Sequence, residues 1–165
     1  MVKVLVIIVL VIALSVAGVL IWGAFLPSTV SATRSAVLRA SVETVFARVT
    51  DPAGQTTWRT DVSAVTMEPG GTAWTETTRG GIVIGFEEVT REAPARYAIR
   101  FASPQGFDGA WEGVFAAEGE NTRVTFTETV TTPSLIGRIL ARLFAPPGAH
   151  IDRYLADLTV AVEKS

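Results

Sequence analysis

The first 26 residues contain the feature that most restricts what this chain can become. From Val4 to Leu26 the sequence has no charged residue, and only one serine and two glycines interrupt the aliphatic and aromatic side chains. As a helix this stretch measures roughly 34 Å, more than the about 30 Å of a bilayer's hydrocarbon layer. It also lacks the polar stripe that a helix of a soluble domain turns toward water. We therefore predict a transmembrane anchor at residues 1–26, with membrane contact through residues 4–26.

A cleaved signal peptide is the main alternative for this segment. Lys3 supplies a basic start, and Val30-Ser31-Ala32 offers small residues for a peptidase. The apolar stretch is, however, longer than the roughly 7–15 residues of a signal peptide, which favours retention as a single-pass anchor. The flanking charges, Lys3 on one side against Arg34 and Arg39 on the other, nearly balance. We lean toward an extracytoplasmic domain because no charge lies between Leu26 and Arg34.

The rest of the chain predicts one water-soluble domain. Pro27 and the small residues after it predict a tether at residues 27–33, and residues 34–165 predict a single domain. There is no cysteine and only one histidine, His150, so thiolate metal sites and multi-histidine sites are excluded, and we expect no metal and no cofactor. The 14 basic and 16 acidic residues nearly cancel, which argues against nucleic acid as a partner.

Local patterns place the elements of this domain. A brief strand is expected around Arg34–Arg39, followed by a helix that begins at the N-cap Ser41 and a second short helix from Asp51 to Trp58. Short runs rich in threonine, valine and aromatics, divided by glycine and proline, predict six strands between residues 61 and 131. From Ser134 onward the spacing is helical, with a break near Pro146.

The strands alternate with a period of two, so one face of the sheet is apolar. Tyr97, Ile99 and Phe101, for example, alternate with Arg96, Ala98 and Arg100. Short connections force antiparallel pairing, because a parallel pair needs a longer crossover. The carboxy-terminal helix is the only long element left to cover the apolar face, which places the domain in the α+β class.

Five short motifs together carry a resemblance to a known family: Ala40 to Phe46, Asp51 to Trp58, Phe107 to Trp111, Asn121 to Thr125 and Tyr154 to Leu158. In their order and spacing they resemble the START-related (SRPBCC) superfamily, and most closely its polyketide cyclase/dehydrase and lipid-transport group. The resemblance covers about residues 34–163. It implies a helix-grip fold, in which a seven-stranded antiparallel sheet wraps round a long C-terminal helix and encloses a hydrophobic cavity, here preceded by one transmembrane helix.

The inward-facing side chains of the predicted sheet and helix are the candidate lining of that cavity. Such a lining suits a hydrophobic small molecule or a lipid, since sites for these ligands are mostly apolar. The same aromatics also fit an ordinary packed core. The candidates are Trp58, Ile84, Phe86, Tyr97, Ile99, Phe101, Trp111, Phe115, Phe126, Glu128 and Leu155. Trp74 stays outside this set because its alternation aligns it with Glu76 and Thr78.

Two polar residues stand out. Glu128 follows Val124 and Phe126 at a period of two, so it points inward or sits at the rim, where it would be hydrated or paired with an arginine. His150 lies next to the break in the terminal helix, either as a proton carrier at the cavity mouth or as an exposed residue of a helix-starting turn, and the second is favoured.

Three functions fit these observations. The favoured one is a membrane-anchored module that binds a lipid or another hydrophobic small molecule in the helix-grip cavity. The second is an enzyme of the polyketide cyclase or aromatase type that uses the same cavity, which ranks lower because the sequence shows no convincing acid/base pair; we assign no catalytic residue. The third is an interaction domain with a filled core.

Overall fold

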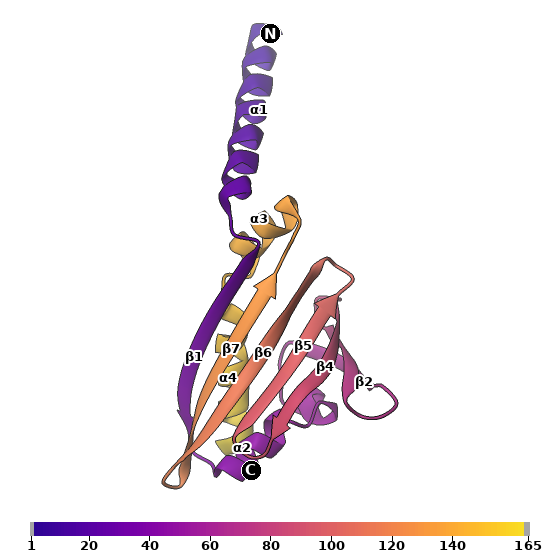
Figure 1. Ribbon diagram of the computed structural model, residues 1–165. Coiled ribbons are helices and arrows are strands. Elements are labelled where there is room, and N and C mark those ends of the chain that lie inside the picture. The colour runs from indigo at the N-terminus through magenta and orange to yellow at the C-terminus, as the bar shows by residue number, and fades with distance from the viewer. Residues whose placement is uncertain (1, 164–165) are drawn as a thin grey trace.

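The computed structural model describes residues 2–163 and shows a long N-terminal helix, one antiparallel sheet and a helix packed along it (Figure 1). The predicted class and order of elements are confirmed. The elements are α1 (Val2–Phe25), β1 (Thr29–Leu38), α2 (Val42–Val49), the 3-10 helix η1 (Ala53–Thr57), β2 (Val62–Met67), β3 (Ala73–Thr78), β4 (Val83–Glu92), β5 (Arg96–Ser103), β6 (Phe107–Glu118), β7 (Asn121–Thr131), α3 (Leu135–Phe144) and α4 (Ala149–Glu163).

The short helices begin where their capping side chains predict. The Ser41 hydroxyl accepts a hydrogen bond from the Thr44 N–H at 3.3 Å, and Ser134 does the same for Gly137 at 2.9 Å. Asp51 caps the 3-10 helix by accepting from the Gly54 N–H at 3.1 Å. In each case the side chain satisfies a backbone donor that has no partner inside the helix.

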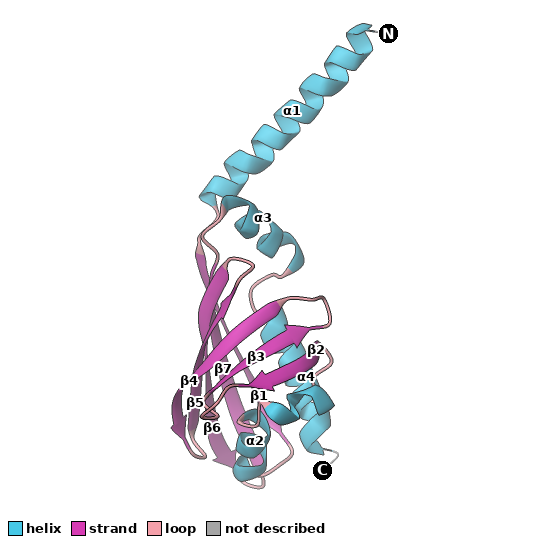
Figure 2. Cartoon of the chain, turned by 90° about the vertical axis from the view of Figure 1, so that its right-hand side faces the viewer, coloured by secondary structure: helices cyan, strands magenta, loops and turns pink. Residues whose placement is uncertain are grey.

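All seven strands form one sheet in the order β1-β7-β6-β5-β4-β3-β2, and every neighbouring pair is antiparallel. The curved sheet carries α4 along its apolar face, so the helix-grip fold is confirmed (Figures 1 and 2). α4 buries one face against the sheet and α2 through Ile151, Tyr154, Leu155, Leu158 and Val162.

Strand β1 is longer than the sequence predicts. It begins at Thr29 rather than near Arg34, so most of the segment expected as a tether at residues 27–33 belongs to the sheet. The reason is its partner: β1 pairs with β7 along its whole length, from Thr29 opposite Thr131 to Leu38 opposite Thr122. Hydroxyl groups also meet across the pair, as at Thr29–Thr131, 3.0 Å apart. The helix α1 therefore connects almost directly to the sheet.

The predicted break in the C-terminal helix is confirmed, and it separates two helices with different surroundings. Pro146-Pro147-Gly148 lies between α3 and α4, and Gly148 has φ +87°, a left-handed conformation that glycine adopts without strain. Only α4 grips the sheet, whereas α3 packs chiefly against α1 (Figure 2). The expectation that the whole C-terminal segment covers the sheet is therefore wrong for α3, because the break turns α3 away.

Helix α1 has the length and composition of a membrane span or of a signal sequence. Its most apolar window has a mean hydropathy of 3.4, and none of that window is buried inside the protein. An apolar surface of this length has no partner within residues 2–163 except where α3 meets its last turns.

Candidate functional site

The predicted cavity lining divides into a packed part and an open part. Beneath α4 the side chains form a closely packed core, in which Phe126 is fully buried and its ring centre lies 4.7 Å from that of Trp111 and 5.7 Å from that of Tyr154. Phe115 also lies against Phe126, with 5.8 Å between the ring centres, and the enclosed cavity that the family resemblance implies stays a prediction. The predicted lining residues in this core are Tyr97, Phe101, Trp111, Phe115, Phe126 and Leu155.

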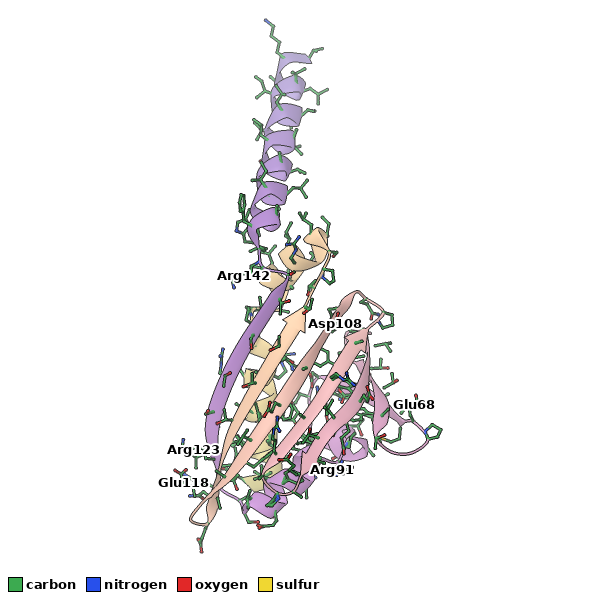
Figure 3. The ribbon with its side chains drawn as sticks, in the orientation of Figure 1. Glu68, Arg91, Asp108, Glu118, Arg123 and Arg142 are labelled. Carbon is green, nitrogen blue, oxygen red and sulfur yellow. The ribbon has the colours of Figure 1, made fainter. Side chains whose placement is uncertain are left out.

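The open part runs from the end of the sheet nearest α1 to the middle of β5, where Ile99 lies opposite Trp111. Here β4, β5, β6 and β7 present apolar side chains on the gripping face that are only half-buried, because α4 begins at Ala149 and α3 turns toward α1. Figure 3 shows Asp108, beside this end of the sheet, below the junction of α1 and α3. We call this surface the apolar mouth. It consists of the predicted residues Ile84, Phe86 and Ile99 together with Phe107 and Val130.

Trp58 lies apart from the mouth. Its ring packs edge-on against Tyr154 of α4, with 5.2 Å between the ring centres. It borders a surface hollow of about 320 Å³ that Asp157 and Val160 also line. Trp58 therefore contacts the core through Tyr154, and its role in lining a ligand site stays a prediction.

A buried ion pair forms the polar floor beside the mouth. Arg59, 6 % exposed, donates to Glu76 at 2.9 Å, and Glu76 also accepts from the Trp74 indole N–H at 3.0 Å. Glu76 lies opposite Ile84 in the sheet, so it borders the mouth directly. Burial opposes the charge of Arg59, but Glu76 and then Asp61 outweigh it and raise the pKa of the guanidinium. The ion pair between Arg59 and Glu76 therefore stabilises the buried guanidinium charge.

Asp61 extends this pair toward the surface. Its carboxylate accepts two hydrogen bonds from Arg59, at 3.0 and 3.1 Å. Burial raises the pKa of Asp61, yet the hydrogen bond and charge of Arg59, assisted by His150, outweigh burial and leave that pKa below its usual value. Arg59, Asp61 and Glu76 were not predicted as site residues, although the alternation that aligned Glu76 with Trp74 was a signal for an inward-facing carboxylate.

His150 joins this group to Glu128. Its Nδ1 lies 2.9 Å from the Glu128 carboxylate, and its Nε2 lies 3.3 Å from a guanidinium nitrogen of Arg59 and 3.6 Å from Asp61. The contact with Glu128 fits a hydrogen bond in which Nδ1–H donates to the carboxylate. Glu128 does point inward, but its partner is a histidine rather than an arginine. His150 is 44 % exposed in the first turn of α4, in line with the favoured expectation, and it has these partners in addition.

Together these five residues form a polar cluster with an excess of negative charge: Arg59, Asp61, Glu76, Glu128 and His150. Three carboxylates face one guanidinium and one imidazole. Glu128 of β7 lies opposite Trp111 of β6, and Trp111 lies opposite Ile99 of β5, so the cluster and the mouth are two strands apart on one face of the sheet. Within residues 2–163, no group of histidine and carboxylate side chains is arranged to hold a metal ion. The arrangement offers an apolar surface with hydrogen-bond acceptors at one side.

The chain matches the sequence model of one protein family. The sequence model described as "Polyketide cyclase / dehydrase and lipid transport" matches residues 29–158, most of the chain, and confirms the resemblance found in the motifs. Among curated proteins, a search found no match.

Solved structures share the fold at low sequence identity. A START superfamily protein from Mycobacterium smegmatis is 15% identical, with a TM-score of 0.62, and the match covers 81% of this chain and 97% of that one. A conserved protein from Geobacillus kaustophilus is also 15% identical, with a TM-score of 0.68 and coverage of 82% and 97%. The Zhui aromatase/cyclase from a Streptomyces species is 13% identical, with a TM-score of 0.64 and coverage of 82% and 94%.

Proposed function

The chain belongs to the polyketide cyclase/dehydrase and lipid transport family, and on that premise we propose that it is a membrane-anchored module that binds a hydrophobic small molecule or a lipid. The observation that carries the proposal is the apolar mouth, where apolar side chains of four strands are only half-buried, from the end of the domain that adjoins α1 to the middle of β5. A ligand that dissolves in the bilayer is concentrated where α1 would hold this mouth. That the domain lies outside the cytoplasm stays a prediction.

The polar cluster suggests the chemical class of the ligand. Its excess of carboxylates disfavours an anionic end such as a fatty-acid carboxylate, since like charges at short range repel. A neutral ligand with a hydroxyl group suits it better, because Glu128 can accept that proton in a hydrogen bond. We therefore propose an apolar ligand with a hydrogen-bond donor at one end.

Extraction of the full chain from its membrane in a lipid-preserving polymer, followed by native mass spectrometry, tests this function. We expect a co-purified neutral ligand at near-stoichiometric level. Ile99→Ser should weaken its retention about five- to tenfold, as expected for losing about 1–1.4 kcal/mol of apolar contact. Val114→Ser is the matched control, because Val114 is a 45 % exposed strand residue outside the mouth. An empty chain, or equal retention in both variants, contradicts the proposal.

Glu128→Gln tests the polar end of the ligand. A hydrogen bond to a charged acceptor contributes about 1.5–3 kcal/mol, so we expect roughly tenfold weaker binding of the co-purified ligand by isothermal titration. Glu118→Gln is the control, because Glu118 forms an exposed ion pair with Arg123 at the far end of the sheet (Figure 3). Unchanged affinity in Glu128→Gln would show that the ligand does not use this carboxylate.

The alternative function is ring closure in a polyketide-like chain, and the contact between His150 and Glu128 favours it as a possible acid/base pair. Against it, both ring nitrogens of His150 already have partners, so neither is free to take a substrate proton without rearrangement. Turnover of a poly-β-keto thioester by the purified chain, lost in His150→Gln, would favour this alternative over binding alone.

A further inference from the structure

Helix α3 has an apolar face that the protein itself does not cover. Its side chains Ile136, Leu140, Leu143 and Phe144 are spaced to share one face, and they are 56 %, 49 %, 60 % and 79 % exposed. Only Ile139 is buried, against Gly23 of α1. A contiguous surface of large apolar side chains is unfavourable in water and marks a site of interaction.

The opposite face of α3 is cationic. Arg138 and Arg142 are the only charged residues of this helix, and within residues 2–163 neither forms an ion pair. The Arg138 guanidinium donates to the Leu26 carbonyl at 2.8 Å, at the end of α1, while its Nε is buried without a hydrogen-bond partner. Figure 3 shows Arg142 beside the junction of α1 and α3. The exposed Arg142 suits the phosphates of lipid headgroups, because the stem of an arginine lies along apolar surface while its guanidinium reaches the phosphate.

The position of α3 along α1 identifies the partner. Side chains Ile136 and Ile139 face Val16, Val19 and Leu20 of α1 across a hollow of about 350 Å³ whose exposed lining is apolar. α3 thus lies beside the last third of α1, near the end where an amphipathic Trp22 favours the headgroup level. The uncovered face of α3 continues the uncovered surface of α1, so lipid chains that surround one also contact the other.

We infer that α3 is an interfacial helix, which lies in the headgroup and upper acyl region of the bilayer that α1 crosses and holds the apolar mouth against the lipid surface. The inference rests on the proposed function in one respect, namely that α1 is a membrane anchor. A helix with an apolar face, an arginine face and an adjoining span has the composition of such interfacial helices. The mouth would then receive its ligand directly from the bilayer.

Spin labelling of the full chain tests this position, and the absence of native cysteine allows single-cysteine variants without background labelling. Nitroxides are placed at L140C and L143C in α3, at V11C in α1, and at V160C as the matched control, an apolar helical site of α4 that is 51 % exposed. In vesicles of phosphatidylcholine and phosphatidylglycerol, collision with oxygen reports lipid and collision with a water-soluble nickel complex reports water.

We expect L140C and L143C to favour oxygen by several fold over the nickel complex and V160C to show the reverse. Water-like values at L140C and L143C, together with lipid-like values at V11C, overturn the inference about α3 while leaving the anchor intact. Water-like values at V11C instead contradict the anchor itself. The two failures are thereby distinguished in one set of measurements.

Discussion

Replacement of Arg59 by methionine is expected to lower the free energy of unfolding by about 3–5 kcal/mol, because it leaves a buried carboxylate without its countercharge. Glu76 is 2 % exposed and would keep only the Trp74 indole as a partner. The loss corresponds to a fall in melting temperature on the order of 10 °C. Circular dichroism during urea and thermal unfolding of the full chain measures both quantities.

Arg123→Met is the control for this prediction. The ion pair of Arg123 with Glu118 is exposed, and exposed pairs contribute about 0–1 kcal/mol. Equal destabilisation by Arg59→Met and Arg123→Met would show that the buried ion pair contributes no more to the free energy of unfolding than the exposed one. Adding Glu76→Gln to Arg59→Met should restore part of the stability, because it removes the uncompensated charge and still leaves an acceptor for Trp74.

Arg59→Met also changes how the stability of the protein depends on pH. Arg59 holds the pKa of Asp61 below the ordinary value of 3.8, so Asp61 contributes its stabilisation fully above that pH and loses it as the pH falls through its folded pKa. In Arg59→Met this pKa rises. The difference in stability between the two chains should therefore shrink as the pH falls, because the variant's buried carboxylates take up protons at a higher pH than those of the original chain.

Local signals were enough to predict most of the fold. The cap at Ser41, the helical spacing from Ser134 onward, the alternation along β5 and the break at Pro146 depend on neighbouring residues, so a single sequence contains them. The start of β1 could not be predicted in this way, because its first residues are small and polar and become a strand only through pairing with β7.

The site was harder to predict than the fold, because it also depends on contacts between residues that are far apart in the sequence. Helical spacing predicts that α3 has an apolar face but not what that face packs against, so α3 was assigned to the sheet rather than to α1. Alternation placed Trp74 and Glu76 on one face, and the presence of the glutamate cast doubt on the tryptophan, whereas both side chains are buried. The missing information was Arg59, which lies 17 residues away in sequence and makes an inward Glu76 possible.

A comparison of two phenylalanines separates the core from the mouth. Phe126→Ala should lower the free energy of unfolding by about 3–5 kcal/mol, because the side chain is fully buried among Trp111, Phe115 and Tyr154 and its removal leaves a cavity. Phe86→Ala should cost less, since Phe86 is half-buried and stacks on Trp74 with 5.3 Å between the ring centres. Urea unfolding of each variant measures the difference.

Ligand retention should change in the opposite order. Phe86 borders the mouth, so Phe86→Ala is expected to lose several-fold more of the co-purified ligand than a folded Phe126→Ala does at low temperature. Native mass spectrometry of both variants, extracted under identical conditions, gives the ratio. If Phe126→Ala instead loses the ligand while Phe86→Ala keeps it, the ligand binds beneath α4, the core opens to admit it, and the mouth serves only as its entrance.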